Sequence, residues 1–304
     1  MNKQLTHIAN QHPCFSAAAS GKALMTHGRI HLPVSPVCNI RCRFCERSFN
    51  KTENRPGVTA GILKPEAAVS LVRGALKLCP EISVAGIAGP GDTLASPHAL
   101  ETFRRIHREF PRLIKCLSTN GLLLEKYAED LFRAGVKTIT VTVNAVDPVI
   151  LDRICSRVIL DGKVYEGTEG AAILIEAQER GIRKAAETGM LIKINIVLIP
   201  PINGGHIAEI AGRVKERGVA LINIIPLIPQ YEFAGFDAPD CIELSLARKD
   251  AEAFLPVFRH CRHCRADACG LLGKENLTSR LSGLLPEELR NGAYQEAEQT
   301  FSHG

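Results

Sequence analysis

The sequence contains no tryptophan, and aromatic residues make up only 5% of its 304 positions. It also contains no run of five or six basic residues, and its formal net charge is +5. Proteins that bind nucleic acid commonly stack bases on aromatic side chains and neutralise phosphates with clustered basic ones. We therefore expect no nucleic-acid partner. The mild positive charge fits small anionic ligands or clusters instead.

Long apolar stretches are missing too. No segment approaches the roughly 18 uninterrupted apolar residues of a membrane-spanning helix. The first residues, MNKQLTHIANQHPCF, lack the apolar core of a signal peptide. We therefore expect a cytoplasmic protein with no membrane partner. In that reducing compartment the eleven cysteines should be thiols, metal ligands or catalytic groups and not disulfides.

Strand and helix patterns alternate along most of the chain. Strands are expected over residues 29–36, 82–89, 113–121, 137–145, 191–200 and 221–229, and helices over 64–79, 98–110, 124–134, 168–188 and 206–217. This alternation predicts an α/β fold with a parallel sheet and right-handed crossovers. The strands fit either an open doubly wound sheet or an incomplete barrel, and periodicity alone does not decide between them. Beyond residue 230 we expect one helix, near 245–258, and no clear strand.

The segment CNIRCRFC contains three closely spaced cysteines, Cys38, Cys42 and Cys45, without a fourth nearby. A structural zinc ion needs four ligands, and a [4Fe-4S] cluster is usually held by four cysteines. Three cysteines leave one iron open to a substrate, unless a distant residue closes it. A zinc knuckle with a remote fourth ligand is the alternative. The cluster is preferred because the cysteines follow the first strand, where barrel-like α/β folds place active-site loops.

Glycines and polar residues follow the later strands. GIAGPGD ends one of them, and its glycines let backbone approach a ligand closely, although a simple tight turn is the alternative. STNG, Asn144 and Asn195 supply hydroxyl and amide groups on the next strands. Each of these residues alone is more often a cap or turn residue. Together they predict one polar rim around a bound ligand.

The cysteine triad, with Phe44 before its third member, resembles the radical S-adenosylmethionine (SAM) superfamily. The resemblance implies a partial (β/α)6 TIM-like barrel. It also implies a catalytic [4Fe-4S] cluster on the triad, whose open iron chelates SAM and whose electron cleaves SAM to a 5′-deoxyadenosyl radical. The SAM contacts that it implies are Gly89, Gly91, Asp92, Ser118, Thr119, Asn120, Thr142, Asn144, Asn195 and Val197.

A closer resemblance covers residues 12 to 273. The blocks HPCF, GRIHLPVSPVCNIRC, RPGVT, GIAGPGD, CLSTNGL, VTVNAVDP, DGKVYEG and HCRHCRADACGLLG occur in the order seen in the NifB family of nitrogenase cofactor (FeMo-co) maturases. That family commonly carries a further cysteine between the triad and RPGV, and residues 46–58 of this sequence contain none.

The NifB resemblance implies two accessory [4Fe-4S] clusters. Their implied ligands are His12, Cys14, Cys116, Cys261 and Cys264. From the residues alone, His12 and Cys14 fit a flexible tail and Cys116 fits a small core residue. Cys261 and Cys264 alone fit half of a zinc site. The same resemblance gives no role to Cys79, Cys155, Cys241 or Cys269, which we expect to be structural thiols.

The implied activity is that of a lyase-type radical SAM enzyme. It would convert two [4Fe-4S] units into the carbide-containing 8Fe-9S-C precursor by SAM-dependent methyl transfer and radical chemistry. A NifU/NifS-like cluster donor, a ferredoxin-like electron donor and a downstream cofactor carrier or scaffold are the implied partners. A radical SAM enzyme acting on a peptide or small molecule and a non-enzymatic iron-sulfur scaffold remain alternatives. We expect an N-terminal strap (1–28), a barrel (29–230) and a C-terminal extension (231–304).

Overall fold

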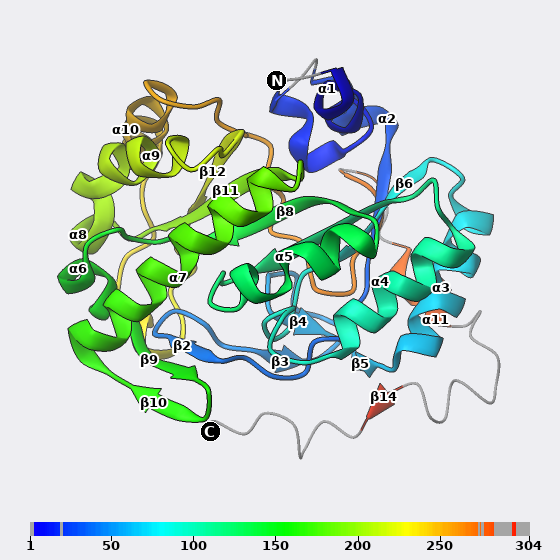
Figure 1. Ribbon diagram of the computed structural model, residues 1–304, viewed down its shortest axis with the longest axis horizontal. Coiled ribbons are helices and arrows are strands. Elements are labelled where there is room, and N and C mark those ends of the chain that lie inside the picture. Colours follow the sequence, from blue (N-terminus) through cyan, green and yellow to red (C-terminus); the bar gives the residue numbers. More distant parts are fainter. Residues whose placement is uncertain (1–2, 19–20, 273, 275–276, 283–293, 296–304) are drawn as a thin grey trace.

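A computed structural model describes residues 3–18, 21–272, 274, 277–282 and 294–295 (Figure 1). Its central sheet has the strand order β12-β11-β8-β7-β6-β1-β13. All of these strands except β13 were expected: β1 (Gly28–His31), β6 (Ile82–Ile87), β7 (Ile114–Thr119), β8 (Val136–Thr142), β11 (Leu191–Leu198) and β12 (Leu221–Pro226). Each of the six is parallel to its neighbour, as predicted.

A helix follows each of the first five of these strands and leads to the next one: α3 (Pro65–Leu78), α4 (His98–Glu109), α5 (Leu124–Arg133), α7 (Gly167–Glu187) and α9 (Ile207–Lys215). Figure 1 shows α4, α5 and α7 lying across one face of the sheet. The helices are amphipathic; α4, for example, buries Ala99, Phe103 and Ile106 against that face. Because neighbouring strands follow chain order, the sheet is wound in one direction only. This order confirms the partial (β/α)6 barrel and excludes the doubly wound alternative.

A second, smaller sheet supports the cysteine loop. It pairs β2 (Ile40–Cys42) with β9 (Cys155–Leu160), which forms a hairpin with β10 (Lys163–Tyr165). The hairpin turns at Asp161 and Gly162, whose φ angles are 51° and 77°. Asp-Gly is a preferred pair for such a two-residue turn, because both positions require positive φ. The hairpin was not among the predicted elements.

The region beyond residue 230 differs from the expectation. Helix α10 covers Cys241–Glu252, and β13 (Cys269–Leu271) pairs with β1 in the antiparallel direction. The expectation of no strand there was therefore wrong, because a three-residue strand is too short to show a period of its own. The helix starts earlier than predicted because Asp240 and Glu243 form a capping box. It also ends earlier, before Pro256, which cannot continue a helix.

The N-terminal segment packs against the barrel. It contains α1 (Lys3–Ala9), a 3-10 helix η1 (Pro13–Ala18) and α2 (Ala23–Thr26). Phe15 is fully buried and clusters with Phe258 and with Leu191 and Leu221, the first residues of β11 and β12. In Figure 1, α1 and α2 lie at the opposite end of the molecule from β2, β9 and β10. The segment thus covers the amino-terminal ends of barrel strands, and the flexible-tail alternative for His12 and Cys14 does not hold.

The remaining elements are short. They are β3 (Ser48–Phe49), β4 (Val58–Thr59), β5 (Ile62–Leu63), α6 (Pro148–Asp152), α8 (Pro200–Asn203), η2 (Gly204–His206), η3 (Tyr231–Phe233), α11 (Thr278–Ser282) and β14 (Tyr294–Gln295). Within the described part of the chain, no helix is long and apolar enough to cross a membrane.

Candidate active site

One cavity of about 630 Å³ runs inside the barrel. Every residue that the sequence predicted as a metal ligand or a SAM contact lines it. The cavity is framed by the inner face of the sheet, the cysteine loop, the N-terminal segment and the loop that carries Cys261 and Cys264. Segments from the beginning, the middle and the end of the chain therefore meet in one space.

Strand alternation explains why polar side chains face this cavity. On β11, Ile192, Ile194 and Ile196 belong to the main hydrophobic core, whereas Lys193 and Asn195 line the cavity. Register continues the pattern across the sheet, because Asn195 pairs with Thr142 on β8 and with Asn223 on β12. The predicted rim is thus a row of side chains across neighbouring strands.

The cysteine triad is held in place by contacts that do not involve its thiols. The amide of Cys45 donates to the carbonyl of Cys42 at 3.0 Å. Gln230 Nε2 donates to the carbonyl of Phe44 at 2.9 Å, and Arg43 pairs with Glu232 at 2.6 Å. The segment after β12 therefore fastens the loop from the opposite edge of the sheet.

The donor chemistry of the triad fits an iron-sulfur cluster. Burial, followed by the nearby carboxylate of Asp92, raises the pKa of Cys38 to about 12. Desolvation also raises the pKa of Cys45, although this residue is more exposed than Cys38. Such thiols stay protonated until a metal displaces their protons. Among the residues that the structure describes, no three His, Cys, Asp or Glu side chains converge as ligands of a single ion. A cluster does not require such convergence, because each thiolate binds a different iron.

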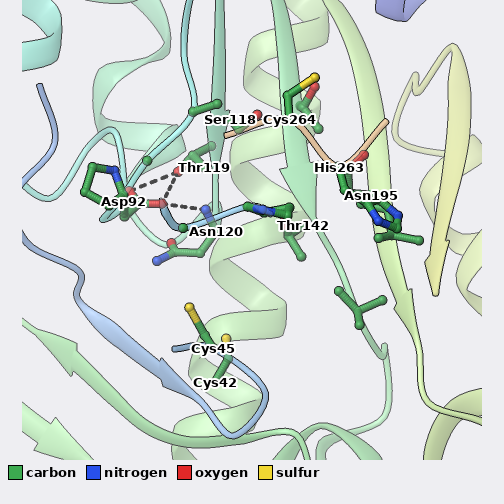
Figure 2. Close-up of a pocket in the computed structure, with 18 of the residues that line it drawn as sticks. Cys42, Cys45, Asp92, Ser118, Thr119, Asn120, Thr142, Asn195, His263 and Cys264 are labelled. Atoms are coloured by element: carbon green, nitrogen blue, oxygen red, sulfur yellow. Dashed lines mark hydrogen bonds between the residues drawn. The ribbon is translucent and has the colours of Figure 1, made fainter. Parts of the chain in front are cut away.

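Asp92 organises the rim next to the triad (Figure 2). Its carboxylate accepts the backbone N–H of Asn120 at 2.6 Å and the hydroxyl of Thr119 at 2.9 Å. Asn120 Nδ2 in turn lies 3.9 Å from the sulfur of Cys38. The preceding Gly91 permits this packing, since a Cβ there would lie 2.0 Å from the carbonyl oxygen of Val37. Asp92 thus ties the STNG turn to the segment that begins the cysteine loop.

Sequence reasoning missed a fourth thiol beside the triad. Cys155 on β9 pairs with Cys42 on β2 in the small sheet, and Cys155 also lines the cavity. The thiol of Cys42 donates to that of Cys155, which raises the pKa of Cys42 and lowers that of Cys155. Because the two thiols are hydrogen-bonded, Cys155 would be placed to hydrogen-bond to Cys42 when Cys42 holds a cluster. The expectation of a purely structural thiol is too simple.

The second group of candidate ligands lies farther along the cavity. In Figure 2, Cys42 and Cys45 lie on one side of the rim, and His263 and Cys264 lie on the other. Cys116 on β7 is separated from β1 by a single strand, β6, whose facing residue is Gly86. Gly86 pairs with both Cys116 and His31, and its missing side chain leaves space between them.

His31 is a second residue that sequence reasoning missed. Its Nδ1 lies 3.1 Å from the carbonyl oxygen of Arg265, and a carbonyl can only accept a hydrogen bond. The proton is therefore on Nδ1, and Nε2 keeps a free lone pair. Burial, followed by the charge of Arg29, lowers the pKa of His31 to about 4, so the ring is neutral. A neutral ring with one nitrogen anchored to a carbonyl is the usual arrangement of a metal-binding histidine.

His12, the predicted nitrogen ligand, has the opposite tautomer. The backbone N–H of Cys14 donates to Nδ1 of His12 at 3.1 Å, so the proton is on Nε2. That Nε2 is buried and has no partner in the described structure. His12 would bind iron only after its ring turned and gave up the contact with Cys14, whereas His31 is ready as it stands.

The C-terminal cysteines approach the cavity beside a buried arginine. Arg29 on β1 donates to the sulfur of Cys264 at 3.1 Å and to the carbonyl of Gly270 at 2.6 Å. The guanidinium thus places a positive charge directly beside the Cys264 sulfur. Cys261 lines the same part of the cavity. The other cysteines, Cys79, Cys241 and Cys269, do not line it.

Comparison with known proteins shows the family to which the chain belongs. Residues 32–214 match the Radical SAM superfamily. The chain is 50% identical over 276 residues to the FeMo cofactor biosynthesis protein NifB of Methanocaldococcus infernus, with 90% of each chain covered. It is 37% identical over 287 residues to the protein of the same name from Azotobacter vinelandii, covering 90% of this chain and 56% of that one.

Solved structures show the same fold at low sequence identity. The enzyme anSMEcpe with bound AdoMet matches with a TM-score of 0.51 and 17% identity, over 74% of this chain and 57% of that one. Methylornithine synthase (PylB) matches with a TM-score of 0.50 and 11% identity, over 84% of this chain and 71% of that one. From the sequence matches, the chain belongs to the NifB family of the radical SAM superfamily.

Proposed function

We propose that this chain is the radical SAM enzyme that builds the 8Fe-9S-C precursor of the nitrogenase cofactor from two [4Fe-4S] substrate clusters. One observation carries the proposal: the triad with its polar rim and a second set of thiols and imidazoles line the same cavity. A radical SAM enzyme acting on a peptide or small molecule would need only the first set. A cluster carrier without enzymatic activity would need no rim.

The residues divide into three groups. Cys38, Cys42 and Cys45 would hold the resident cluster, and the rim tied down by Asp92 would orient SAM beside it. Cys14 and Cys116, with His31 or His12, would hold one substrate cluster. Cys261 and Cys264 would hold the other. When bound, the resident cluster and SAM would supply hydrogen-abstracting radical chemistry and the methyl carbon that becomes the carbide.

The remaining roles of the chain's own residues are binding and exclusion of water. The cavity walls keep both substrate clusters within reach of the rim, and the N-terminal segment covers the far end. A NifU/NifS-like cluster donor, a ferredoxin-like electron donor and a downstream carrier are the partners that this function requires. The lyase-type classification and the cytoplasmic location belong to the same proposal.

Anaerobic reconstitution followed by iron, sulfide and EPR quantification tests the proposal. At four irons per [4Fe-4S] cluster, the wild-type chain should hold about twelve irons, against about four for the peptide-modifying alternative. The double variant Cys261→Ala/Cys264→Ala should lose about four irons and still form 5′-deoxyadenosine from SAM. It should no longer activate cofactor-free nitrogenase.

Cys241→Ala is the matched control, because Cys241 is exposed and lies outside the cavity. Its iron content should equal that of the wild type. If the double variant keeps all its iron but loses about one zinc, the C-terminal pair is a structural site and the proposal fails.

A further inference from the structure

Lys193 is a buried cation without an acidic partner. It lies on β11 and is 6% exposed. Its Nζ lies 5.0 Å from the ring centroid of Phe15 and 5.6 Å from that of Phe258. Among the described residues, the only lysine in an ion pair is Lys184. The ammonium of Lys193 is therefore held between two aromatic rings at the edge of the cavity, with no carboxylate to balance it.

This placement is costly for the empty protein. An ammonium on a side chain that is mostly buried gives up part of its hydration, and such groups are normally paired or neutralised. Contact with the two aromatic rings offsets only part of this cost. Hydrophobic packing would be served better by an uncharged side chain of the same length. We therefore infer that an anion balances the positive charge of Lys193 when the substrate is bound.

The groups that face Lys193 indicate which anion this is. Its charge acts on the thiols of Cys14 and Cys116 and on the imidazoles of His12 and His31. Phe15 lies one residue from Cys14, so the N-terminal segment brings both an aromatic contact and a candidate ligand to the same place. Candidate ligands from three segments thus surround one ammonium.

The lining of the whole cavity carries a net positive charge, like Lys193 itself. The lining contains six basic side chains: Arg29, Arg41, Arg47, Arg157, Lys193 and Arg262. Only two carboxylates line it, Glu46 and Asp92, and Asp92 is occupied by the rim. Sulfide and thiolate ligands give iron-sulfur clusters a negative charge. At the end near Cys14 and His31 the acting cations are Lys193 and Arg29, and neither carboxylate of the lining is a residue of that end, so an anionic cluster fits there better than a neutral or cationic ligand.

We propose that Lys193, clamped between Phe15 and Phe258, is the counter-charge that retains an anionic iron-sulfide cluster at Cys14 and Cys116. The inference rests on the proposed function, since it requires a substrate cluster at this end. Lys193 acts through space and not as an iron ligand. Its positive charge favours the reduced, more negative state of the cluster. Lys193 therefore lowers the stability of the empty chain and increases the retention of the substrate cluster.

Two substitutions test this role. Lys193→Met keeps the length and the apolar contact with both rings but removes the charge, and Lys193→Arg keeps the charge. Lys137→Met is the matched control: Lys137 also lies on a barrel strand, with its Nζ 5.0 Å from the ring of Phe132, but it does not line the cavity. Each protein is reconstituted anaerobically with iron and sulfide, and the midpoint potential of each cluster is measured by EPR-monitored titration.

Lys193→Met should lower the iron content by about four per chain, the content of one cluster, or shift the accessory cluster to a more negative potential. Lys193→Arg and Lys137→Met should match the wild type in both measurements. Before reconstitution, Lys193→Met should unfold at a denaturant concentration no lower than that of the wild type, because it removes an uncompensated buried charge.

Three results would overturn the inference. The first is a Lys193→Met protein with wild-type iron content and wild-type potentials. The second is a Lys193→Arg protein as deficient as Lys193→Met, which would make the role steric. The third is an empty Lys193→Met protein that is less stable than the wild type, which would make the two aromatic contacts structural. A wild-type chain with only about four irons would instead overturn the proposed function together with this inference.

Discussion

The backbone N–H of Asn120 donates to the carboxylate of Asp92 at 2.6 Å, and this bond joins two of the segments that form the polar rim. Asp92 is 5% exposed, and it also accepts from Thr119 and from the backbone of Leu94. The carboxylate thus accepts its hydrogen bonds from groups of the protein itself. Its role in binding SAM would be to hold the STNG turn in position.

Asp92→Asn should therefore weaken SAM binding without removing the triad cluster. The NH₂ group of the new amide would face N–H and hydroxyl groups that now donate to the carboxylate. Leaving such buried donors unpaired costs about 1–3 kcal/mol of stability. Anaerobic titration with SAM and iron analysis measure the two effects. Asp147→Asn is the control, since Asp147 also accepts two backbone N–H groups but caps α6, and asparagine caps equally well. If Asp92→Asn bound SAM as tightly as the wild type, the alternative interpretation of GIAGPGD as a simple tight turn would hold.

Cys155 should tune the triad cluster without holding it. Once Cys42 binds iron it has no proton to donate, so Cys155 becomes the donor to the ligand sulfur. Hydrogen bonds to cluster sulfurs are among the factors that set the reduction potential. Cys155→Ala should therefore keep the iron and shift the triad cluster to a more negative potential, and Cys155→Ser should shift it less. Cys79→Ala, a buried thiol outside the cavity, is the control.

The competing outcome for Cys155 is a loss of iron. If Cys155→Ala lost about four irons, Cys155 would be a fourth ligand and no iron of the triad cluster would be open for SAM. Cys42→Ala provides the reference for such a loss, since it should abolish SAM cleavage while leaving the barrel folded.

His31 and His12 should differ as nitrogen ligands. Because Nε2 of His31 is free and Nε2 of His12 carries a proton, we expect the nitrogen coupled to an accessory cluster to belong to His31. Pulsed EPR on protein labelled with ¹⁵N-histidine measures this coupling. It should vanish in His31→Ala and persist in His12→Ala. The reverse result would mean that the ring of His12 turns when the cluster binds.

The ion pair between Arg265 and Asp267 should be important for stability. Both side chains are buried, at 6% and 8% exposure, and they are joined by hydrogen bonds of 2.8 and 3.0 Å. Asp267 also accepts the backbone N–H of Ala60 at 2.7 Å. The pair thus fastens the segment after Cys264 to the loop that follows the triad.

Asp267→Asn should lower the free energy of unfolding by about 3–5 kcal/mol, because it removes the carboxylate that balances the buried guanidinium of Arg265, which then keeps only the carbonyls of Asn50 and Glu53. Glu179→Gln is the comparison: Glu179 pairs with Arg213 and Arg217 at the surface of the barrel, where an ion pair contributes at most about 1 kcal/mol. Denaturant titration of both apo-proteins measures the difference. Equal effects of the two substitutions would show that the C-terminal segment is not held by this pair.

Much of the fold could be predicted because its barrel strands and helices are long enough to show their periods. The small elements could not. β13 has three residues and depends on β1 for its existence, so no local pattern marks it. The hairpin of β9 and β10 did carry a signal, the Asp-Gly pair at residues 161–162, but its flanking strands alternate weakly.

The candidate site could be predicted for the cysteine loop, for the polar residues at or near the ends of strands and, through the family resemblance, for Cys116 within β7. The residues that were missed lie inside strands. Arg29 and His31 alternate in an expected strand, and in another Lys193 alternates with Asn195, which was predicted. A polar residue at every second position of a buried strand indicates an inner, functional face. The contact of Cys155 with Cys42 had no such signal, because it depends on the register of β2 and β9.

The most direct test of the account follows the methyl carbon of SAM. The reconstituted chain is incubated with SAM carrying ¹⁴C in its methyl group, with dithionite as reductant, and the iron-sulfur product is passed to cofactor-free nitrogenase. The account predicts that ¹⁴C accompanies the cluster that restores nitrogenase activity, and that neither transfer occurs with Cys261→Ala/Cys264→Ala. Restored activity without label, or 5′-deoxyadenosine formation with all ¹⁴C left in SAM and methionine, would contradict it.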